Sequence, residues 1–307
     1  HCLRVMVAKP YSERPEWSDV VPVPQDDGPH PLVPIDYSPE FSETMDYFRA
    51  VLQADERTPR VLELTEDVIA LNPANYTAWH FRRLVNEAIG RSWQEELDWT
   101  SSLAADNPKN YQLWFHRRFC IEKVNDPGDE LQWIAKYLLD PELEDAKNYH
   151  VWGHRQWVLE HFKLWDKELP FTEVLIESDV RNNSAWNQRY YCVAKTETFD
   201  KEEVRLREVE YALHCLARAP NNESPWNYIR GVLKGHKLSA CAVLRQRCLD
   251  WQPSYADCAF LLEMLADIAI EEGDVARADG LLALLEQTVD VIRAKYWAYR
   301  RVQLKAT

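Results

Sequence analysis

The 307-residue chain contains only eight glycines, and neither a Gly-x-Gly-x-x-Gly sequence nor a Walker sequence occurs in it. Nucleotide-binding turns need glycines that let the backbone approach phosphate groups closely, so a Rossmann or P-loop site is disfavoured. Strand-like alternation is scarce as well. No apolar run is long enough to span a bilayer and no signal peptide is recognisable, so we expect no membrane span.

The chain has fewer basic than acidic residues, and its formal net charge is −14. Nucleic-acid binding requires clustered cations that displace counterions, so we expect no nucleic-acid partner, and an RNA-processing repeat protein is disfavoured.

The seven cysteines are odd in number and form no Cys-x-x-Cys pair. This usage is typical of free thiols in the core of a cytoplasmic protein. No His-Glu-x-x-His sequence, other metal-spaced cluster or nucleophile motif occurs, so we expect no metal bound by this chain.

What the chain does contain is a motif of the form Asn-x-x-x-Trp, repeated five times. Arginine follows the tryptophan by three residues in four of the five copies. A motif that recurs at a period of 20–50 residues indicates stacked supersecondary units. The repeats are centred on Trp79, Trp114, Trp152, Trp186 and Trp226.

Each repeat is predicted to be a helix, a short Pro/Asn turn and a second helix that carries the tryptophan. Asparagine is a favoured N-cap, which places the tryptophan and arginine on one face of the second helix. We expect the tryptophan to pack between layers and the arginine to tie one layer to the next. The fold class is therefore all-α, a right-handed superhelical solenoid of antiparallel helical hairpins, crescent-shaped and similar to tetratricopeptide repeats.

The domain organisation follows from composition. Residues 1–45 hold eight of the 17 prolines and are predicted to form an extended N-terminal arm. A disordered tail and an arm lying along a partner both fit this composition. Residues 46–307 form the predicted solenoid, in which a degenerate sixth unit around Trp251 and closing cap helices follow the five repeats.

Two of the five repeats differ from the other three at the predicted helix caps. They carry Lys109-Asn110-Tyr111-Gln112 and Lys147-Asn148-Tyr149-His150. Helix N-termini attract anions, and basic and hydroxyl side chains at two adjacent N-termini strengthen that preference. The sequence thus predicts a phosphate or carboxylate site at this position. The alternative interpretation is that these residues only cap and decorate a solvated rim.

At these residues the sequence also resembles a known family. The blocks Lys109–Trp114, Lys147–Trp152, Arg181–Arg189, Phe162–Asp166 and Asp46–Leu52 closely resemble the α subunit shared by protein farnesyltransferase and protein geranylgeranyltransferase type I. The resemblance extends over residues 15–300, with the blocks in the same order and spacing.

The resemblance implies an obligate heterodimer with a β subunit, which holds the catalytic zinc and the isoprenoid pocket. The enzyme would transfer farnesyl or geranylgeranyl from its diphosphate to the cysteine of a C-terminal CaaX motif, active only with the β subunit. It leaves open whether magnesium assists.

The resemblance also implies roles for individual residues. Lys109 would be the main contact of this chain to the diphosphate, with His150 nearby. Tyr149 and Tyr111 would line the same site, and Lys109, His150 and Tyr149 are the candidate catalytic residues. Gln112 would bind the carboxylate of the CaaX peptide, and Asn148 would be the helix cap that fixes the loop.

Two alternatives remain for the function. A non-catalytic tetratricopeptide-like peptide-binding scaffold has a similar period, although the Asn-x-x-x-Trp-x-x-Arg signature differs from its pattern. The α subunit of Rab geranylgeranyltransferase is the other, although no leucine-rich array or strand-rich insert is found in the chain.

Overall fold

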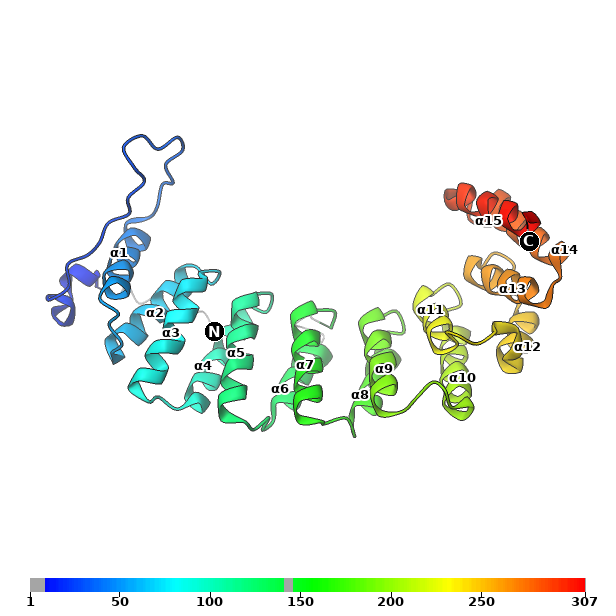
Figure 1. The fold of residues 1–307 in the computed structure, drawn as a ribbon, viewed down its shortest axis with the longest axis horizontal. Helices are drawn as coiled ribbons and strands as arrows, with labels where there is room; N and C mark the ends of the chain where they lie inside the picture. Colours follow the sequence, from blue (N-terminus) through cyan, green and yellow to red (C-terminus); the bar gives the residue numbers. More distant parts are fainter. Residues whose placement is uncertain (1–8, 141–145, 307) are drawn as a thin grey trace. The chain divides into compact units, whose positions relative to one another are not determined.

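The computed structural model describes residues 9–140 and 146–306, which are largely α-helical and contain no β-strand (Figure 1). They form two compact units. Of the described residues, 9–134 and 148–157 form one unit, and 135–140, 146–147 and 158–306 form the other. In each unit successive helices pack as hairpins, which confirms the predicted all-α solenoid of helical hairpins.

The helices have the following bounds. The first unit contains α1 (Pro39–Gln53), α2 (Pro59–Leu71), α3 (Tyr76–Ile89), α4 (Trp93–Asp106) and α5 (Tyr111–Val124), preceded by the 3₁₀ turns η1 (Tyr11–Glu13) and η2 (Pro15–Trp17). Helices α6 (Glu130–Leu139) and α7 (Tyr149–Phe162) begin in the first unit and end in the second. The second unit continues with α8 (Glu168–Ser178), α9 (Asn183–Thr196), α10 (Glu202–Arg218), α11 (Glu223–Val232), η3 (Leu238–Ala240), α12 (Ala242–Trp251), α13 (Ala259–Glu272), α14 (Val275–Leu284), η4 (Leu285–Val289), η5 (Val291–Arg293) and α15 (Ala294–Ala306).

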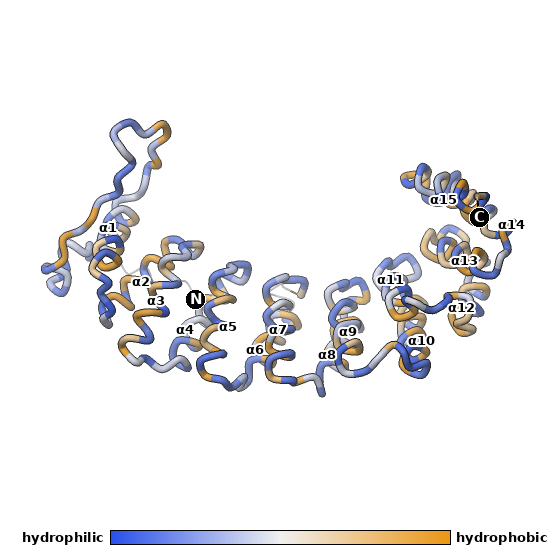
Figure 2. Tube along the Cα trace, viewed as in Figure 1, coloured by the Kyte–Doolittle hydropathy of each residue, from blue (hydrophilic) through white to orange (hydrophobic). Residues whose placement is uncertain are grey.

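Hydrophobic and hydrophilic residues are interspersed along each helix, the pattern of amphipathic helices that pack on one face (Figure 2). The repeated asparagines cap the second helix of each hairpin, as predicted. Asn75 accepts from the N–H of Ala78 at 3.1 Å, and Asn110 accepts from that of Leu113 at 2.8 Å. Each cap satisfies a backbone donor that the first helical turn would otherwise leave unpaired.

A hydrogen-bonded joint that the sequence did not reveal links consecutive repeats. The carbonyl of Pro73 accepts from Nε1 of Trp79 in its own repeat and from Nδ2 of Asn110 in the next, at 2.8 and 2.9 Å. The tryptophan ring is thereby fixed at its polar edge while its apolar face is buried. The same joint recurs at Pro108, with donors Trp114 and Asn148, and at Val180, with donors Trp186 and Asn222.

The predicted sixth unit has a modified version of this joint. Helices α12 and α13 pack together, and Cys258 occupies the cap position of α13. Its Sγ donates to the carbonyl of Pro220 at 3.3 Å, where the other repeats use asparagine. Trp226 supplies the second donor at 2.8 Å. The hairpin architecture thus continues past the last recognisable Asn-x-x-x-Trp motif.

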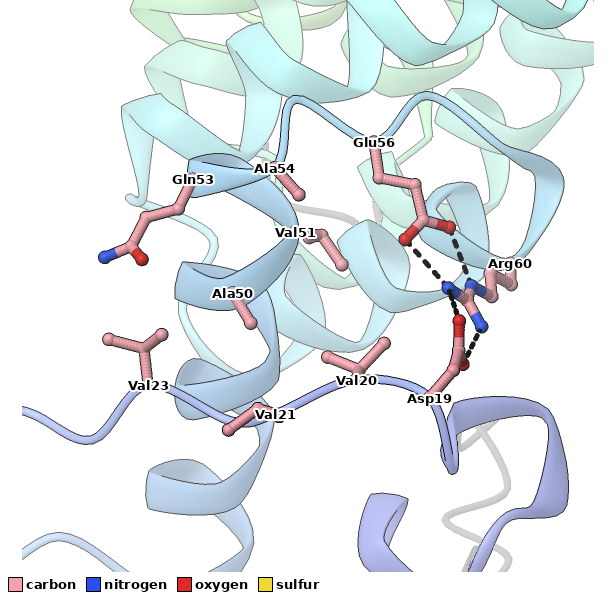
Figure 3. Close-up of a pocket in the computed structure, with 10 residues that line it drawn as sticks. All are labelled: Asp19, Val20, Val21, Val23, Ala50, Val51, Gln53, Ala54, Glu56 and Arg60. Carbon is pink, nitrogen blue, oxygen red and sulfur yellow. Dashed lines mark hydrogen bonds and ion pairs between the residues drawn. The ribbon is translucent and has the colours of Figure 1, made fainter.

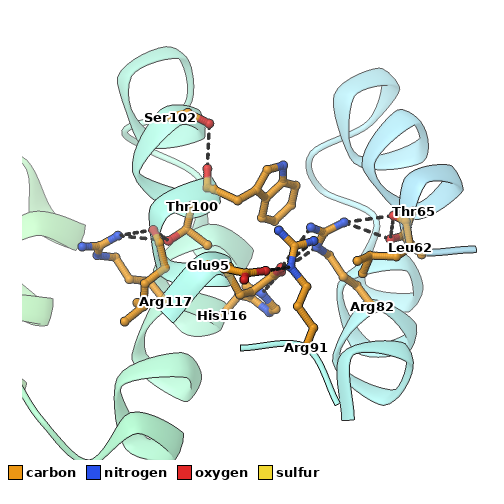
Figure 4. Close-up of polar contacts among 12 residues, drawn as sticks. Leu62, Thr65, Arg82, Arg91, Glu95, Thr100, Ser102, His116 and Arg117 are labelled. Carbon is orange, nitrogen blue, oxygen red and sulfur yellow. Dashed lines mark hydrogen bonds and ion pairs between the residues drawn. The ribbon is translucent and has the colours of Figure 1, made fainter. Parts of the chain in front are cut away.

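Buried Arg–Glu pairs also connect neighbouring hairpins, which confirms the role predicted for the arginines. Arg82 of α3 donates to the carboxylate of Glu96 on α4 at 2.5 and 3.0 Å. His116 of α5 contacts the same carboxylate at 2.8 Å, and Figure 4 labels Arg82 and His116. All three side chains are fully buried. The Arg82 guanidinium also lies 3.5 Å from the ring centroid of Trp99, a cation–π contact.

The same cluster recurs at Arg117, Glu130 and His154, with distances of 2.5–2.7 Å. In later repeats the histidine is replaced. Gln188 donates to Glu168 at 2.7 Å, and the Tyr228 hydroxyl donates to Glu208 at 2.6 Å. These glutamates, and the partners two positions after the last four repeat tryptophans, were not predicted from the sequence. The recurring Trp-x-His-Arg spacing was the available signal.

The protonation states follow from burial and pairing. Burial by itself raises the pKa of Glu96, but hydrogen bonds and charge from His116 and Arg82 outweigh it and hold the pKa at about 2. Burial lowers the pKa of His116 below its usual value of 6.5, against the raising effect of Glu96. At neutral pH the carboxylate is therefore ionised and the imidazole is neutral, donating its Nε2 proton to the carboxylate. Nδ1 of His116 is buried and has no partner among the described residues.

The N-terminal segment packs against α1 and α2 of its own chain from residue 9 to residue 23. Tyr11 and Trp17 are each 3% exposed and form an aromatic cluster with Tyr47, with ring centroids 5.2–5.8 Å apart. Further along, Arg60 of α2 binds both Asp19 and Glu56 at one end of a cleft of about 450 Å³ (Figure 3). Residues 24–40 are exposed.

Helix α1 begins at Pro39, whereas the sequence placed the start of the helical region at residue 46. Ser38 caps this helix by accepting from the N–H of Phe41 at 3.1 Å. Proline at the first helical position costs no hydrogen bond, because that N–H has no partner within the helix. Pro39 therefore starts a helix, although the sequence analysis counted it among the prolines of the arm.

Candidate functional site

The candidate site lies at the N-termini of α5 and α7, and its residues all belong to the first unit. We call it the α5–α7 site, and its six residues are Lys109, Tyr111, Gln112, Asn148, Tyr149 and His150. Asn148 caps α7, since its Oδ1 accepts from the N–H groups of His150 and Val151 at 2.8 and 3.2 Å. Asn110 caps α5 in the same way.

The joint at Pro108 brings the two helix ends together. Nδ2 of Asn148 donates to the Pro108 carbonyl at 3.0 Å, and Lys109 follows Pro108 directly. The first turns of the two helices are therefore neighbours, and both direct unpaired N–H groups and the positive ends of their dipoles to the same region. The sequence prediction that two helix N-termini meet here is confirmed by this bond.

Aromatic contacts bring three of the predicted side chains together. The rings of Tyr111 and His150 meet edge to face with centroids 4.2 Å apart, and Tyr149 lies 5.4 Å from His150. Tyr111 is 63% exposed and Tyr149 is 75% exposed, so both phenols face outward. His150 is partly buried, which lowers its pKa below 6.5 and keeps the imidazole neutral at pH 7.

The two lysines of the predicted site differ in their surroundings. Lys109 is exposed, and no carboxylate pairs with it in residues 9–140 and 146–306. Lys147, at the equivalent position in the next repeat, forms an ion pair of 3.2 Å with Asp179 within the second unit. Of these two lysines, Lys109 is therefore the one without a carboxylate partner among the described residues, and its ammonium can approach a ligand.

Gln112 and Asn148 are nearly buried, at 8% and 5% exposure. Nε2 of Gln112 lies 3.4 Å from the carbonyl of Ala74 in the preceding repeat, a long hydrogen bond. Such a weak contact leaves the amide able to exchange partners. Asn148, by contrast, is held on both sides of its amide by the cap and the Pro108 joint.

The rest of the described chain bears on the predictions about metal binding, membrane spans and cysteines. Within the described ranges no three His, Cys, Asp or Glu residues lie close enough together to hold a metal ion. Nor is any described helix both long enough and apolar enough to cross a bilayer. Cys2 lies outside the described residues, and the other six cysteines are free and buried, as predicted.

Comparison with known proteins identifies the family. Residues 59–89, 93–124, 128–162, 165–196 and 206–235 match the protein prenyltransferase alpha subunit repeat, and each match spans two consecutive helices of the structure. A protein farnesyltransferase/geranylgeranyltransferase type-1 subunit alpha from Dictyostelium discoideum is 43% identical over 304 residues, which cover 95% of this chain and 93% of the relative. The chain belongs to the prenyltransferase α-subunit family.

A second relative and a solved structure support the same family assignment. The corresponding protein of Arabidopsis thaliana, with the same name, is 43% identical over 319 residues, covering 96% of each chain. A chain in the solved structure of Candida albicans protein geranylgeranyltransferase-I complexed with GGPP superposes with a TM-score of 0.85 at 28% identity, covering 94% of this chain and 98% of that one. The repeat match favours a prenyltransferase α subunit over a tetratricopeptide scaffold. The similarity to these two type-1 subunits favours it over the Rab geranylgeranyltransferase α subunit.

Proposed function

We propose that this chain is the α subunit of a heterodimeric CaaX prenyltransferase, which transfers farnesyl or geranylgeranyl from the isoprenoid diphosphate to a cysteine thiol of the CaaX motif. The observation that supports this role is the α5–α7 site. In a chain of this family, a lysine with no described carboxylate partner, a neutral histidine and two outward phenols gather at two helix N-termini.

The reaction needs charge stabilisation at the diphosphate. As the bond between C1 of the isoprenoid and the bridging oxygen breaks, negative charge builds on the departing diphosphate. The ammonium of Lys109 supplies an opposing charge, and it is not neutralised by a described carboxylate. His150 is neutral at pH 7 and acts as a hydrogen-bond donor, with its ring held against Tyr111.

The two tyrosines and the helix ends complete the proposed diphosphate site. Tyr111 and Tyr149 present their hydroxyls from the first position of each helix. Hydroxyl donors and free backbone N–H groups bind phosphate oxygens without proton transfer. This arrangement holds the diphosphate in place, while the isoprenoid and the thiol lie on the side of the partner subunit.

Gln112 is the proposed contact to the terminal carboxylate of the CaaX peptide. Its present bond to the Ala74 carbonyl is long, at 3.4 Å, so a charged acceptor can replace it. Hydrogen bonds to a carboxylate are shorter and roughly twice as strong as those between neutral groups. Binding of the peptide would therefore redirect the amide at little cost.

The partner is a β subunit that carries the zinc and the lipid pocket, and zinc would activate the peptide thiol there. Exposed aromatic side chains in and beside the α5–α7 site support a partner surface on this unit, because large exposed apolar groups mark interaction sites. They are Tyr76, Tyr111, Phe115 and Tyr149, at 61–75% exposure. We place the enzyme in the cytoplasm, where free thiols persist.

The test compares Lys109→Ala with its matched control Lys147→Ala in the heterodimer. Loss of one group that stabilises transition-state charge costs about 10²–10³ in rate, so we expect Lys109→Ala to slow single-turnover transfer about 100-fold or more. Peptide affinity should be unchanged. Lys147→Ala should keep the rate within about twofold, since Lys147 already pairs with Asp179.

Two outcomes would overturn the proposal. One is a single-turnover rate for Lys109→Ala equal to that of the control. The other is transferase activity of the full chain without any partner, or failure of the chain to copurify with a β subunit on co-expression.

A further inference from the structure

The side chain of Asn148 connects the two halves of the α5–α7 site. Its Oδ1 accepts from the N–H groups of His150 and Val151, and its Nδ2 donates to the carbonyl of Pro108. One planar amide therefore binds the first turn of α7 at one edge and the residue before Lys109 at the other. It is 5% exposed, and both ends of its amide are already engaged in these bonds, so its role is to connect the two loops.

The backbone around Lys109 is held from both sides. The Pro108 carbonyl receives a second bond from Nε1 of Trp114 at 2.8 Å. On the other side, the N–H of Asn110 donates to the Asn107 carbonyl at 3.1 Å and closes the turn. The Lys109 side chain is exposed and free to rotate, so the direction of its backbone decides which region the ammonium can reach.

We propose that Asn148 is the positioning residue for Lys109, setting the lysine relative to His150 through the Pro108 carbonyl. This inference rests on the proposed function, in which Lys109 and His150 act on one diphosphate. Catalytic groups that must act together are sensitive to small displacements, and a shift of about 1 Å can cost about 100-fold in rate. The joint at Pro108 would restrict that displacement.

The chain provides a matched control for this idea. Asn222 caps α11 and donates to the carbonyl of Val180 at 2.7 Å, which is the same joint two repeats later and within the second unit. Its loss should carry a similar structural cost without touching the α5–α7 site. Serine is as good an N-cap as asparagine, but it lacks the amide N–H that reaches the neighbouring carbonyl.

The experiment measures single-turnover transfer by the heterodimer for Asn148→Ser and Asn222→Ser. We expect Asn148→Ser to slow the chemical step roughly 10- to 100-fold at saturating substrates, with peptide affinity changed less than about twofold. Asn222→Ser should leave the rate within about twofold of the unmodified enzyme. Both variants should lower thermal stability to a similar extent, because each loses one buried hydrogen bond.

A double variant separates positioning from a general structural effect. In the Lys109→Ala background, Asn148→Ser should produce little further loss of rate, because the group that it positions is gone. Equal rates for Asn148→Ser and Asn222→Ser, or losses that multiply in the double variant, would overturn the inference. If Lys109→Ala alone leaves the rate unchanged, the proposed function fails instead, so the two failures are distinguishable.

Discussion

Replacing Arg82 with methionine should destabilise the first unit more than any comparable change at its surface. The guanidinium makes two bonds to Glu96, and both side chains are fully buried. Methionine keeps the apolar stem but leaves Glu96 with the neutral His116 at 2.8 Å and the more distant Arg91 at 3.9 Å. Breaking a buried ion pair from one side costs about 3–5 kcal/mol, because the remaining charge stays buried.

The matched control is Arg57→Met. Arg57 binds Asp55 through two bonds of 3.0 Å, the same fork geometry, but the two side chains are 38% and 64% exposed. Exposed pairs contribute about 0–1 kcal/mol, since water solvates either partner when the other is lost. The two variants thus remove the same functional group from a buried site and from a solvated one.

Hydrogen–deuterium exchange of the full chain provides the assay. Because 1.36 kcal/mol corresponds to a factor of ten, a loss of 3 kcal/mol lowers amide protection in α3 and α4 by about 100-fold or more. For Arg57→Met, we expect a change of less than about fivefold. Adding Glu96→Leu to Arg82→Met should restore part of the protection, because no unpaired charge remains. Equal protection in Arg82→Met and Arg57→Met would refute this account of the repeat joint.

Two further predictions follow from the same side chains. His116 and His154 are buried and neutral, with pKa values lowered by burial. Below about pH 6.5 the unfolded chain therefore binds protons at these histidines that the folded chain does not. The free energy of unfolding should fall there by up to about 1.4 kcal/mol per pH unit for each histidine. Replacing both with glutamine, as Gln188 stands naturally in a later repeat, should flatten thermal stability between pH 7 and 5, and an unchanged slope would contradict it. Trp17→Ala should remove the buried ring that packs on Tyr11, at a cost of about 3–5 kcal/mol in the stability of this contact. Limited proteolysis between residues 9 and 37 should then be faster. Cleavage at the original rate would show that other contacts hold this segment.

The local sequence determined the helices and their caps. Each asparagine cap is a contact within one turn, so the spacing Asn-x-x-x-Trp was enough to place α5 and α7. The period of the motif predicted the hairpins because every repeat buries its apolar face against the next. The buried positions of Trp114 and Arg117 followed from the same spacing, since a residue three positions later lies on the same face.

Sequence reasoning failed where a local pattern had two interpretations. Pro39 was assigned to the arm, although with Ser38 as a cap it opens α1. The glutamates that pair with the repeat arginines were overlooked because Glu96 lies in an acidic first turn, where carboxylates are ordinarily solvated. Its burial depends on Arg82 and His116, which come from other helices.

The sequence by itself determined that this chain is a series of capped helical hairpins, and it singled out two caps that carry unusual polar residues. Only the tertiary structure decided that the cap of α7, Asn148, donates to the Pro108 carbonyl at the start of the loop before α5, and that the ring of His150 contacts Tyr111. It also decided that Lys147 is paired while Lys109 has no described carboxylate partner. The physical reason is the separation along the sequence of the residues that interact. Helix formation depends on residues within a few positions, whereas a ligand site depends on which turns the stacking of repeats brings into contact.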